Sequence, residues 1–382
     1  MLRNLKEAYI VAGKRTAVGV AKSGAFRSFK PEDLAVTVVR ELVASVPYFE
    51  PSMVEGIFMG NAAPGMQLAS QVGRIVAQRA LGMEAPGIII NRYCASGLES
   101  IALATAKIQT GQAECIIAGG VESISSAPAT RWDTVHQYTH MVNEPDYFLN
   151  MALTAEQVAK DFDISREQQD TYSLRSHQKA VAAINAGYLK NAILPVDVDG
   201  KIVDRDECPR ADINMDELAS LKPLFPDGTL TTGNASPLCD GAAFVMVMSE
   251  NMVKELEVQP MGRLIACSSA VGSYERKHGL GCMAAIPAAL KQADLTMSEL
   301  DLIELNEAFA AQSIAAIKES NLNPDLVNIN GGAIAFGHAM GSTGTRLSIQ
   351  LLNDLKRTDK RFGMVTACVG SSQGIAGVFE SF

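Results

Sequence analysis

Residues 88–101 read Ile-Ile-Ile-Asn-Arg-Tyr-Cys-Ala-Ser-Gly-Leu-Glu-Ser-Ile, a short apolar run followed by a polar loop and an amphipathic pattern. The apolar run, residues 88–91, predicts a buried strand. The spacing of the apolar residues that follow predicts a helix, whose buried face comprises Leu98, Ile101, Thr105 and Ile108. Cys94 lies where the strand gives way to the helix. Strand, loop and helix in this order indicate an α/β fold.

The same order of elements recurs in the last third of the chain. Four apolar runs have counterparts in the same sequence order: 8–12 with 264–267, 56–59 with 302–305, 88–91 with 327–330, and 115–118 with 364–367. Helical patterns separate the runs, which predicts parallel sheets with crossover helices. We expect the first helix of each copy to open at Pro31 and near Pro287. The chain is therefore predicted to contain two similar βαβ-rich halves.

The middle of the chain does not fit the repeat. Residues 120–240 hold 19 acidic and 10 basic residues, a difference of −9 that equals the net charge of the whole chain. Polar helical patterns and turn residues fill this segment, so we expect a mainly helical insertion. The predicted division is residues 1–118 plus 241–260 for the first half, 119–240 for the insertion, and 261–382 for the second half.

Length and composition limit the classes of function. The chain has 382 residues, 47% of them hydrophobic and 20% charged, which is typical of a globular enzyme with two domains. Its 33 basic and 42 acidic residues provide no basic surface for nucleic acid. No apolar run reaches the ~18 residues of a membrane helix, and no leader pattern is recognised, so we expect a cytoplasmic protein. Its seven cysteines form no C-x-x-C pair, which predicts free thiols and no metal site.

Four side chains that could take part in catalysis lie at the predicted carboxyl ends of strands, the edge where ligands bind in such sheets: Cys94, Asn306, His338 and Cys368. A thiol at a helix N-terminus has its thiolate stabilised by the helix dipole, which favours a nucleophile over an inert buried cysteine. Asn306 alone is equally well explained as a helix N-cap. The loop after Cys368 offers backbone amides for an oxyanion. Together these residues indicate a cysteine nucleophile, a histidine base and a second thiol acid.

Four blocks of this sequence resemble the signature blocks of the thiolase family: residues 91–97 (Asn-Arg-Tyr-Cys-Ala-Ser-Gly), 306–309 (Asn-Glu-Ala-Phe), 331–338 (Gly-Gly-Ala-Ile-Ala-Phe-Gly-His) and 368–370 (Cys-Val-Gly). The resemblance runs the full length of the chain and is closest to bacterial degradative 3-ketoacyl-CoA thiolases. It implies a layered αβαβα core of two duplicated halves and an inserted loop domain that binds CoA.

The resemblance also implies a reaction: thiolytic cleavage of a 3-ketoacyl-CoA by CoA, giving acetyl-CoA and a shortened acyl-CoA in fatty-acid β-oxidation. In that reaction Cys94 is the nucleophile that carries the acyl group, His338 is its base, and Cys368 is the acid and base of the second step. Asn306 holds a water in one oxyanion site, and the amide of Gly370 contributes to the other. CoA and acyl-CoA are substrates, and no cofactor is implied.

For CoA binding, the resemblance places Arg210 near the adenine, Ser236 near the pantetheine, and Met151 and His278 in the acyl pocket. It further implies a homodimer or a dimer-based tetramer. A dehydrogenase-hydratase subunit of β-oxidation is a candidate partner.

The sequence departs from the family pattern at several positions. Ala339 and Cys282 stand where proline is usual, Ser371 and Ser372 stand in a usually glycine-rich run, and His278 replaces a typical methionine. We expect these changes to alter the preference for acyl-chain length.

Three alternatives stay open. One is a biosynthetic thiolase that forms acetoacetyl-CoA, because synthetic relatives share every catalytic residue. Another is a condensing enzyme that resembles ketoacyl synthases, although these lack the second reactive cysteine at the place of Cys368. The third, from a different class, is a catalytically silent acyl-CoA-binding subunit.

Overall fold

The computed structural model describes residues 5–63, 71–127, 151–272 and 280–382. The first half contains β1 (Ala8–Arg15), β2 (Gly19–Val20), η1 (Ala25–Ser28), α1 (Pro31–Ala44), η2 (Pro51–Met53), β3 (Ile57–Gly60), α2 (Val72–Leu81), β4 (Gly87–Ile90), η3 (Tyr93–Ala95), α3 (Ser96–Gln109) and β5 (Cys115–Ser123). The described part of the insertion contains α5 (Met151–Asp161), α6 (Arg166–Asn185), β6 (Val196–Val198), β7 (Lys201–Val203) and α7 (Met215–Ser220).

After the insertion the chain returns to the first half through β8 (Cys239–Ser249) and α8 (Glu250–Glu255). The second half contains β9 (Gly262–Val271), α9 (Cys282–Ala293), η7 (Met297–Glu299), β10 (Leu302–Leu305), α10 (Ala310–Glu319), α11 (Ala333–Phe336), α12 (Met340–Arg357), β11 (Phe362–Val369) and β12 (Gln373–Ser381).

The strand order shows the duplication. The first half has the order β4-β3-β5-β8-β1, and the second has β10-β11-β12-β9, with an isolated bridge from Ile303 to Val327 where a counterpart of β4 would lie. The two halves join where β1 meets β9, at Ile10 and Gly262. The predicted duplicated fold is therefore confirmed.

The sheets are mixed, so the expectation of parallel sheets is only partly correct. β3 pairs in parallel with β4 and β5, and β10 pairs in parallel with β11. In contrast, β12 follows β11 through a tight turn and must pair antiparallel, because so short a connection cannot cross over. β8 pairs with β5 in the same way, and Ser123 lies opposite Asp240. The insertion thus leaves the sheet between these two residues, at the position that a hairpin turn occupies in the second half.

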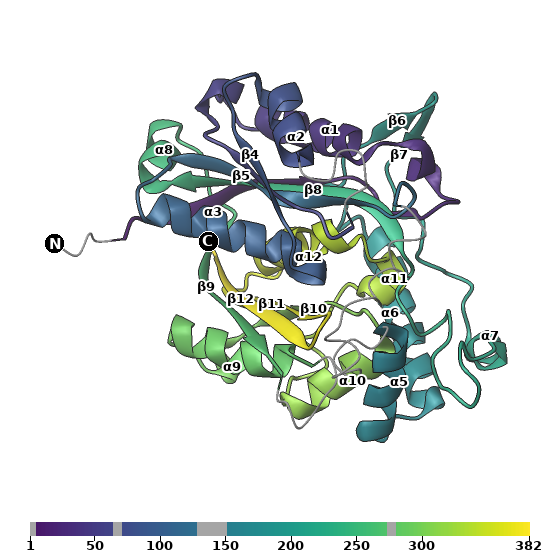
Figure 1. The fold of residues 1–382 in the computed structure, drawn as a ribbon. Helices are drawn as coiled ribbons and strands as arrows, with labels where there is room; N and C mark the ends of the chain where they lie inside the picture. Colours follow the sequence, from purple (N-terminus) through teal and green to yellow (C-terminus); the bar gives the residue numbers. More distant parts are fainter. Residues whose placement is uncertain (1–4, 64–70, 128–150, 273–279) are drawn as a thin grey trace, which may run out of the picture.

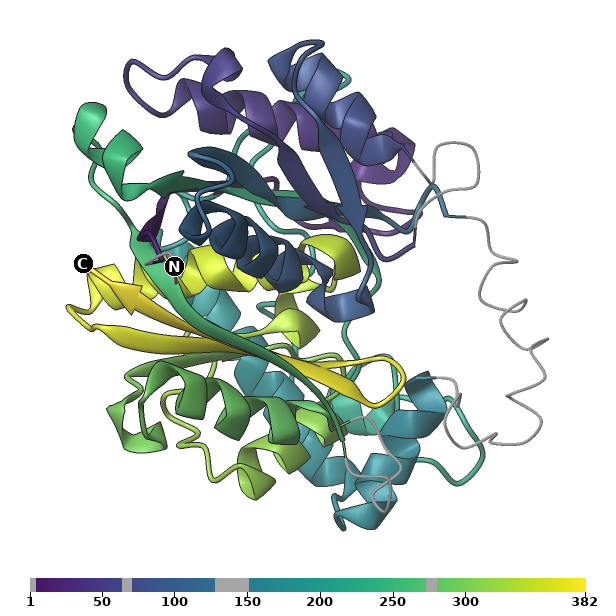
Figure 2. The same cartoon turned by 60° about the vertical axis from the view of Figure 1, so that its left-hand side comes forward.

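Helices cover both outer faces and fill the space between the two sheets (Figures 1 and 2). Helices α1 and α2 lie on the outer side of the first half, and α9 packs on β9 and β12 on the outer side of the second. Helices α3 and α12 lie together in the middle and contact both halves. This arrangement is the predicted αβαβα layering.

The two central helices touch through glycines. A Cβ atom on Gly97 would lie 2.8 Å from the backbone nitrogen of Thr345, and one on Gly344 would collide with the backbone nitrogen of Leu98. No other residue allows backbones to approach this closely. The contact brings the N-terminal ends of α3 and α12 together, which are the two ends expected to carry Cys94 and His338.

Helix starts differ in how well the sequence predicts them. α1 begins at Pro31 as expected, with Glu32 and Asp33 in its first turn. The expectation of a start near Pro287 is wrong, because α9 begins at Cys282 and Pro287 lies inside it. Pro287 removes one intrahelical hydrogen bond, and the packing of α9 on the sheet compensates for the stability lost with that bond.

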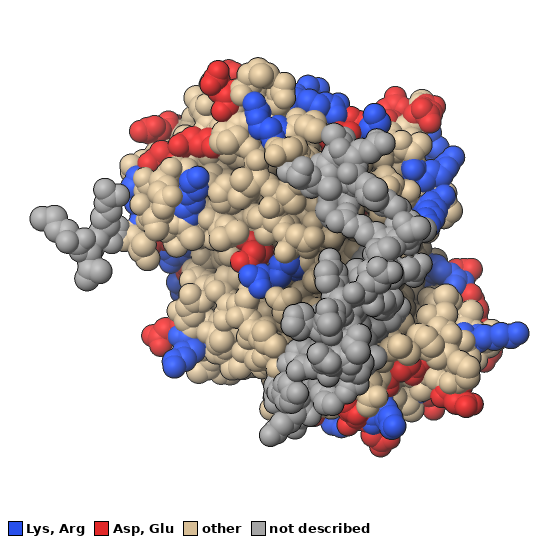
Figure 3. Space-filling view, in the orientation of Figure 1, with Lys and Arg blue, Asp and Glu red and all other residues tan. Residues whose placement is uncertain are grey.

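The insertion is anchored to the first half by a buried ion pair. Arg15, at the end of β1, donates two hydrogen bonds to Asp206, at 2.7 and 2.8 Å, and Asp206 also accepts from the backbone of Val18. Helices α5 and α6 of the insertion pack against α10 of the second half (Figure 1). On the face drawn in Figure 3, acidic and basic side chains are interspersed around the margin, and the coloured surface shows no broad basic area.

Candidate active site

Cys94 lies on η3, between β4 and α3, in a loop held by side-chain hydrogen bonds. The side-chain oxygen of Asn91 accepts from the backbone of Tyr93 at 3.1 Å, and the hydroxyl of Ser96 donates to the Tyr93 carbonyl at 2.7 Å. These bonds hold Tyr93 in a left-handed conformation, with φ of 45°. η3 also contacts α12, and Cys94 packs against a small apolar cluster that includes Met340, at the start of α12. The loop is thus fixed on both sides of the thiol.

The Cys94 thiol is protonated at rest. Burial raises its pKa to about 12, although the backbone amides of Cys94 and Gly370 favour the thiolate. The nearby Cys368 and Glu122 raise the pKa further. The expected stabilisation by a helix N-terminus is therefore outweighed by desolvation. A nucleophile in this state needs a neighbouring base.

His338 is oriented as such a base. Its Nδ1 lies 2.8 Å from the Thr343 hydroxyl, which itself donates its proton to the carbonyl of Ala339 at 3.0 Å. The hydroxyl can therefore only accept from Nδ1–H, so the other ring nitrogen, Nε2, carries the lone pair. Burial, with the charge of Arg346, lowers the pKa of His338 to about 3. The ring is neutral at physiological pH and can accept a proton.

Asn306 faces this imidazole. It follows β10, where its backbone donates to Thr366 at 2.9 Å, and its side-chain nitrogen lies 3.5 Å from Nε2 of His338. The N-cap interpretation is wrong, because α10 begins at Ala310 and its N-cap is Phe309. The side-chain oxygen of Asn306 is buried and has no hydrogen-bond partner. Such an atom is costly unless a water or a substrate donates to it.

Cys368 lies near the end of β11, and Gly370 lies in the turn between β11 and β12. The Cys368 side chain is buried, and the amide of Gly370 favours the thiolate of Cys94, so the turn lies near the nucleophile. Ser371 and Ser372 both adopt left-handed conformations, with φ of 63° and 57°. The backbone thus keeps the shape for which glycine is best suited, despite the two serines.

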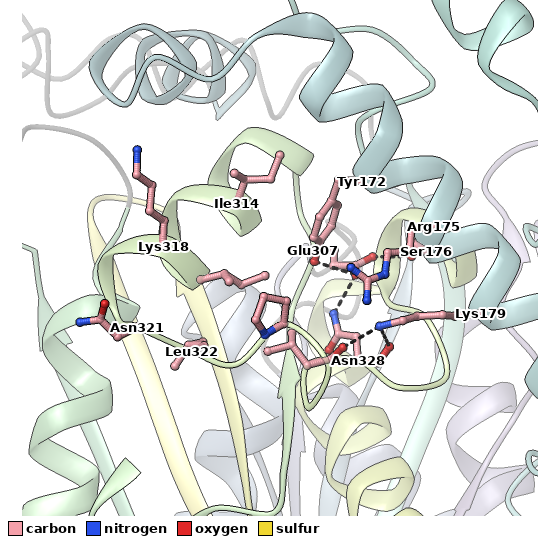
Figure 4. Close-up of a pocket in the computed structure, with 13 residues that line it drawn as sticks. Tyr172, Arg175, Ser176, Lys179, Glu307, Ile314, Lys318, Asn321, Leu322 and Asn328 are labelled. Atoms are coloured by element: carbon pink, nitrogen blue, oxygen red, sulfur yellow. Dashed lines mark hydrogen bonds between the residues drawn. The ribbon is translucent and has the colours of Figure 1, made fainter. Parts of the chain in front are cut away.

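Glu307 anchors the segment that carries Asn306. Its carboxylate accepts hydrogen bonds from Tyr172, Ser176 and Asn328, at 3.0, 2.7 and 2.7 Å (Figure 4). It lies at the edge of a cavity of about 550 Å³ between α6 and α10. None of the predicted catalytic side chains lines this cavity, so it is separate from the thiol site.

Two of the predicted CoA-contacting residues lie beside the thiol site. Ser236 precedes Pro237, whose carbonyl accepts the backbone N–H of His338 at 3.0 Å. The sulfur of Met151 lies 3.7 Å from the position that a Cβ atom on Gly370 would take. The segments that carry these two residues therefore border the reactive groups.

Arg210, a third predicted contact, is not brought to that place. The guanidinium of Arg210 donates to Glu217 at 2.8 Å and lies 3.7 Å from Asp212, beside a cavity of about 320 Å³ next to α6. No predicted catalytic side chain lines that cavity. His278 lies outside the described residues.

Three residues of the site were missed as functional groups. Thr343 sets the tautomer of His338, and its signal is a hydroxyl in the first turn of the helix that follows. Glu122 accepts backbone hydrogen bonds from Ala62 and Gly341, and its signal is a carboxylate in an otherwise apolar strand. Cys282 was noted only as a departure from the family, yet its sulfur lies 2.8 Å from that of Cys368.

Within the described ranges, no group of His, Cys, Asp and Glu side chains could hold a metal ion. Across those same ranges, no helix has the length and apolar character needed to cross a membrane.

Comparison with known proteins gives concordant matches over almost the whole chain. Residues 8–251 match the family domain described as "Thiolase, N-terminal domain", and residues 258–381 match "Thiolase, C-terminal domain". The 3-ketoacyl-CoA thiolase of Bacillus subtilis is 40% identical, covering 98% of this chain and 100% of the relative. The beta-ketothiolase BktB of Cupriavidus necator is 38% identical, with 98% and 99% covered.

Solved structures agree with these matches. The human mitochondrial 3-ketoacyl-CoA thiolase in complex with CoA is similar with a TM-score of 0.91 and 34% identity, covering 99% of each chain. The acetyl-CoA acetyltransferase of Bacillus anthracis is similar with a TM-score of 0.91 and 36% identity, covering 99% of this chain and 100% of the other. From the two matched domains and these relatives, the chain belongs to the thiolase family of acyltransferases.

Proposed function

We propose that this protein cleaves a 3-ketoacyl-CoA with CoA, through an acyl group carried on Cys94. The observation that carries the proposal is the surroundings of the Cys94 sulfur. The backbone amides of Cys94 and Gly370 favour the thiolate form of this sulfur, and a second thiol, Cys368, lies close enough to influence its pKa. A nucleophilic thiol, amides for an oxyanion and a second thiol acid are the groups that acyl transfer with carbon–carbon cleavage needs.

In the first step, Nε2 of His338 takes the proton of Cys94 as the sulfur attacks the 3-keto carbon. The negative charge that develops on the keto oxygen needs donors, and the unpartnered oxygen of Asn306 can orient a water toward it. The bond between the second and third carbons then breaks. Cys368 gives its proton to the departing carbon, which releases acetyl-CoA.

In the second step, the Cys368 thiolate takes the proton of the incoming CoA thiol. The CoA sulfur attacks the thioester on Cys94, and the amides of Cys94 and Gly370 stabilise the oxyanion next to the sulfur. Breaking the thioester returns the Cys94 thiolate, which regains its proton from His338. Both cysteines end as thiols, ready for another turn.

The relatives named 3-ketoacyl-CoA thiolase support a role in fatty-acid β-oxidation. CoA and acyl-CoA are then substrates, and no cofactor takes part. The homodimer and the cytoplasmic location stay predictions of the sequence. Binding of a CoA phosphate at Arg210 would have to compete with Glu217.

A second candidate is the reverse direction, condensation of two acetyl-CoA molecules. The similarity to a protein named acetyl-CoA acetyltransferase favours including it. Rates of thiolysis over a series of 3-ketoacyl-CoA chain lengths, compared with the rate of condensation of acetyl-CoA, distinguish the two. Mass spectrometry of the intact protein after incubation with acyl-CoA should show an adduct on Cys94. An absence of any adduct would leave only a binding role.

A further inference from the structure

A third thiol lies against the two that the proposed reaction uses. The sulfur of Cys282 is 2.8 Å from that of Cys368, and both side chains are buried in the same apolar cluster. Cys282 is the first residue of α9. No step described above involves it.

The contact is set by the backbone. Across the β11–β12 hairpin, Cys368 lies opposite Gly374. A Cβ atom on Gly374 would collide with the backbone nitrogen of Cys282, and one on Gly281 would collide with the backbone of Gln373. Because only glycine at both positions allows this approach, the start of α9 lies directly on the strand that pairs with Cys368.

The Cys282 thiol holds its proton strongly. The hydrogen bond with Cys368, followed by burial, raises the pKa of Cys282 well above its usual value, while the amides of Met283 and Cys282 act in the opposite direction. Cys282 is therefore a thiol that can donate its S–H to a neighbouring sulfur. Cys94 is the other titratable group that acts with Cys368, and Glu122 acts on Cys94 in turn.

We propose that Cys282 is a positioning residue for Cys368, donating its S–H hydrogen bond to the Cys368 thiolate between the two proton transfers. When Cys368 protonates the departing carbon, the electron pair stays on its sulfur, and the Cys282 proton turns toward that sulfur. When the CoA thiol returns a proton to Cys368, the original hydrogen bond from Cys368 to Cys282 is restored. This role rests on the proposed thiolytic function, because that reaction leaves Cys368 as a thiolate.

The test compares Cys282→Ala, which removes the donor, with Cys282→Ser, which keeps one. Cys115→Ala is the matched control, since Cys115 is also a fully buried thiol but lies in β5, away from this pair. The first measurement needs no turnover: the pH dependence of Cys368 alkylation by iodoacetamide, followed by peptide mass spectrometry. The second is kcat and KM for thiolysis.

For Cys282→Ala we expect the alkylation profile of Cys368 to move to higher pH by about one unit, and kcat to fall about tenfold with KM little changed. Cys282→Ser should restore most of the parent's alkylation profile and kcat. Cys115→Ala should match the parent protein in both measurements. Unchanged alkylation and kcat in Cys282→Ala would overturn the role, as would equal kcat losses in the Ala and Ser variants with an unshifted profile. A parent protein without thiolysis would refute the proposed function, while the alkylation profile would still decide whether the thiols are coupled.

Discussion

Asn61 and Asn306 occupy equivalent places in the two halves, each directly after a short parallel strand, β3 or β10. The side-chain nitrogen of Asn61 is fully used in the scaffold, since it donates to the carbonyl of Val121 at 2.9 Å and to the carboxylate of Glu122 at 3.0 Å. Asn306 instead contacts the ring of His338 and leaves its buried oxygen without a partner. The duplicated fold thus places an asparagine at the same position in each half. The asparagine with an unused hydrogen-bond acceptor, Asn306, is the one in the candidate active site.

The carboxylates beside these asparagines also differ. Glu122 binds backbone amides around the Cys94 loop, and burial raises its pKa to about 7 even though those amides favour its charged form. Glu307 is satisfied by side chains from α6 and from Asn328. Glu122 therefore binds the backbone of both halves, through Ala62 and Gly341, whereas Glu307 depends partly on the insertion.

The largest effect should come from removing the nucleophile of the first half. Cys94→Ala should lower kcat/KM for thiolysis by on the order of 10⁴-fold or more, because no other group can carry the acyl chain. Cys267→Ala, a half-buried thiol on β9, should retain the parent rate. Substantial turnover in Cys94→Ala would exclude the acyl-enzyme route.

The two asparagines give a matched pair. Asn306→Ala should lower kcat by about 10²- to 10³-fold, with little loss of stability, because it removes an oxyanion contact. Asn61→Ala should instead cost about 1–3 kcal/mol in the free energy of unfolding and affect kcat less, because it leaves buried partners unsatisfied. Steady-state kinetics and urea denaturation check both variants. If both variants lost kcat and stability to a similar extent, the two asparagines would not differ in role.

A third test uses the protonation of His338. Because its pKa is lowered to about 3 in the fold, the unfolded chain binds a proton below about pH 6.5 that the native protein does not. This group therefore makes the parent lose stability as pH falls from about 6.5 toward 3, by on the order of 1.4 kcal/mol per unit. His338→Gln should lose less over this range, as measured by urea denaturation at several pH values. If the free energy of unfolding of both proteins depended on pH in the same way, a buried neutral ring at His338 would be contradicted.

The smallest effect concerns the turn that follows Cys368. Ser371→Gly should raise Tm by about 1–2 °C, because glycine relieves a left-handed conformation, partly offset by a more flexible unfolded chain. Ser52→Gly, at an exposed position without a positive φ, should lower Tm slightly. If the Tm of Ser371→Gly is no higher than that of Ser52→Gly, the left-handed conformation of Ser371 does not destabilise the protein.

Much of this architecture could be predicted from the repeat of apolar runs. Equivalent strands end at the same edge of each sheet, so Cys94, Asn306 and Cys368 could be assigned to strand ends without coordinates. His338 instead follows the short helix α11, and the expected strand 327–330 is only an isolated bridge. The antiparallel return of β8 could not, because the insertion hides the fact that β5 and β8 form a hairpin.

The protonation of the site depends on packing between distant segments. Burial raises the pKa of Cys94, and a local helix-dipole argument does not include burial. The contact between Cys282 and Cys368 requires two glycines, at 281 and 374, to meet across the sheet. No sequence pattern near either cysteine indicates that these two glycines are in contact.

The position of β8 has a consequence for synthesis of the chain. β8 lies between β1 and β5, and its residues 239–249 follow the whole insertion. During translation the first sheet therefore lacks its middle strand until about two thirds of the protein has been made, and β1 has no neighbour before then. Pairing across so long a separation is slow, and the unpaired edges of β1 and β5 are exposed meanwhile. A nascent chain that stops before residue 249 should need a chaperone, whereas the completed chain closes both sheets around β1.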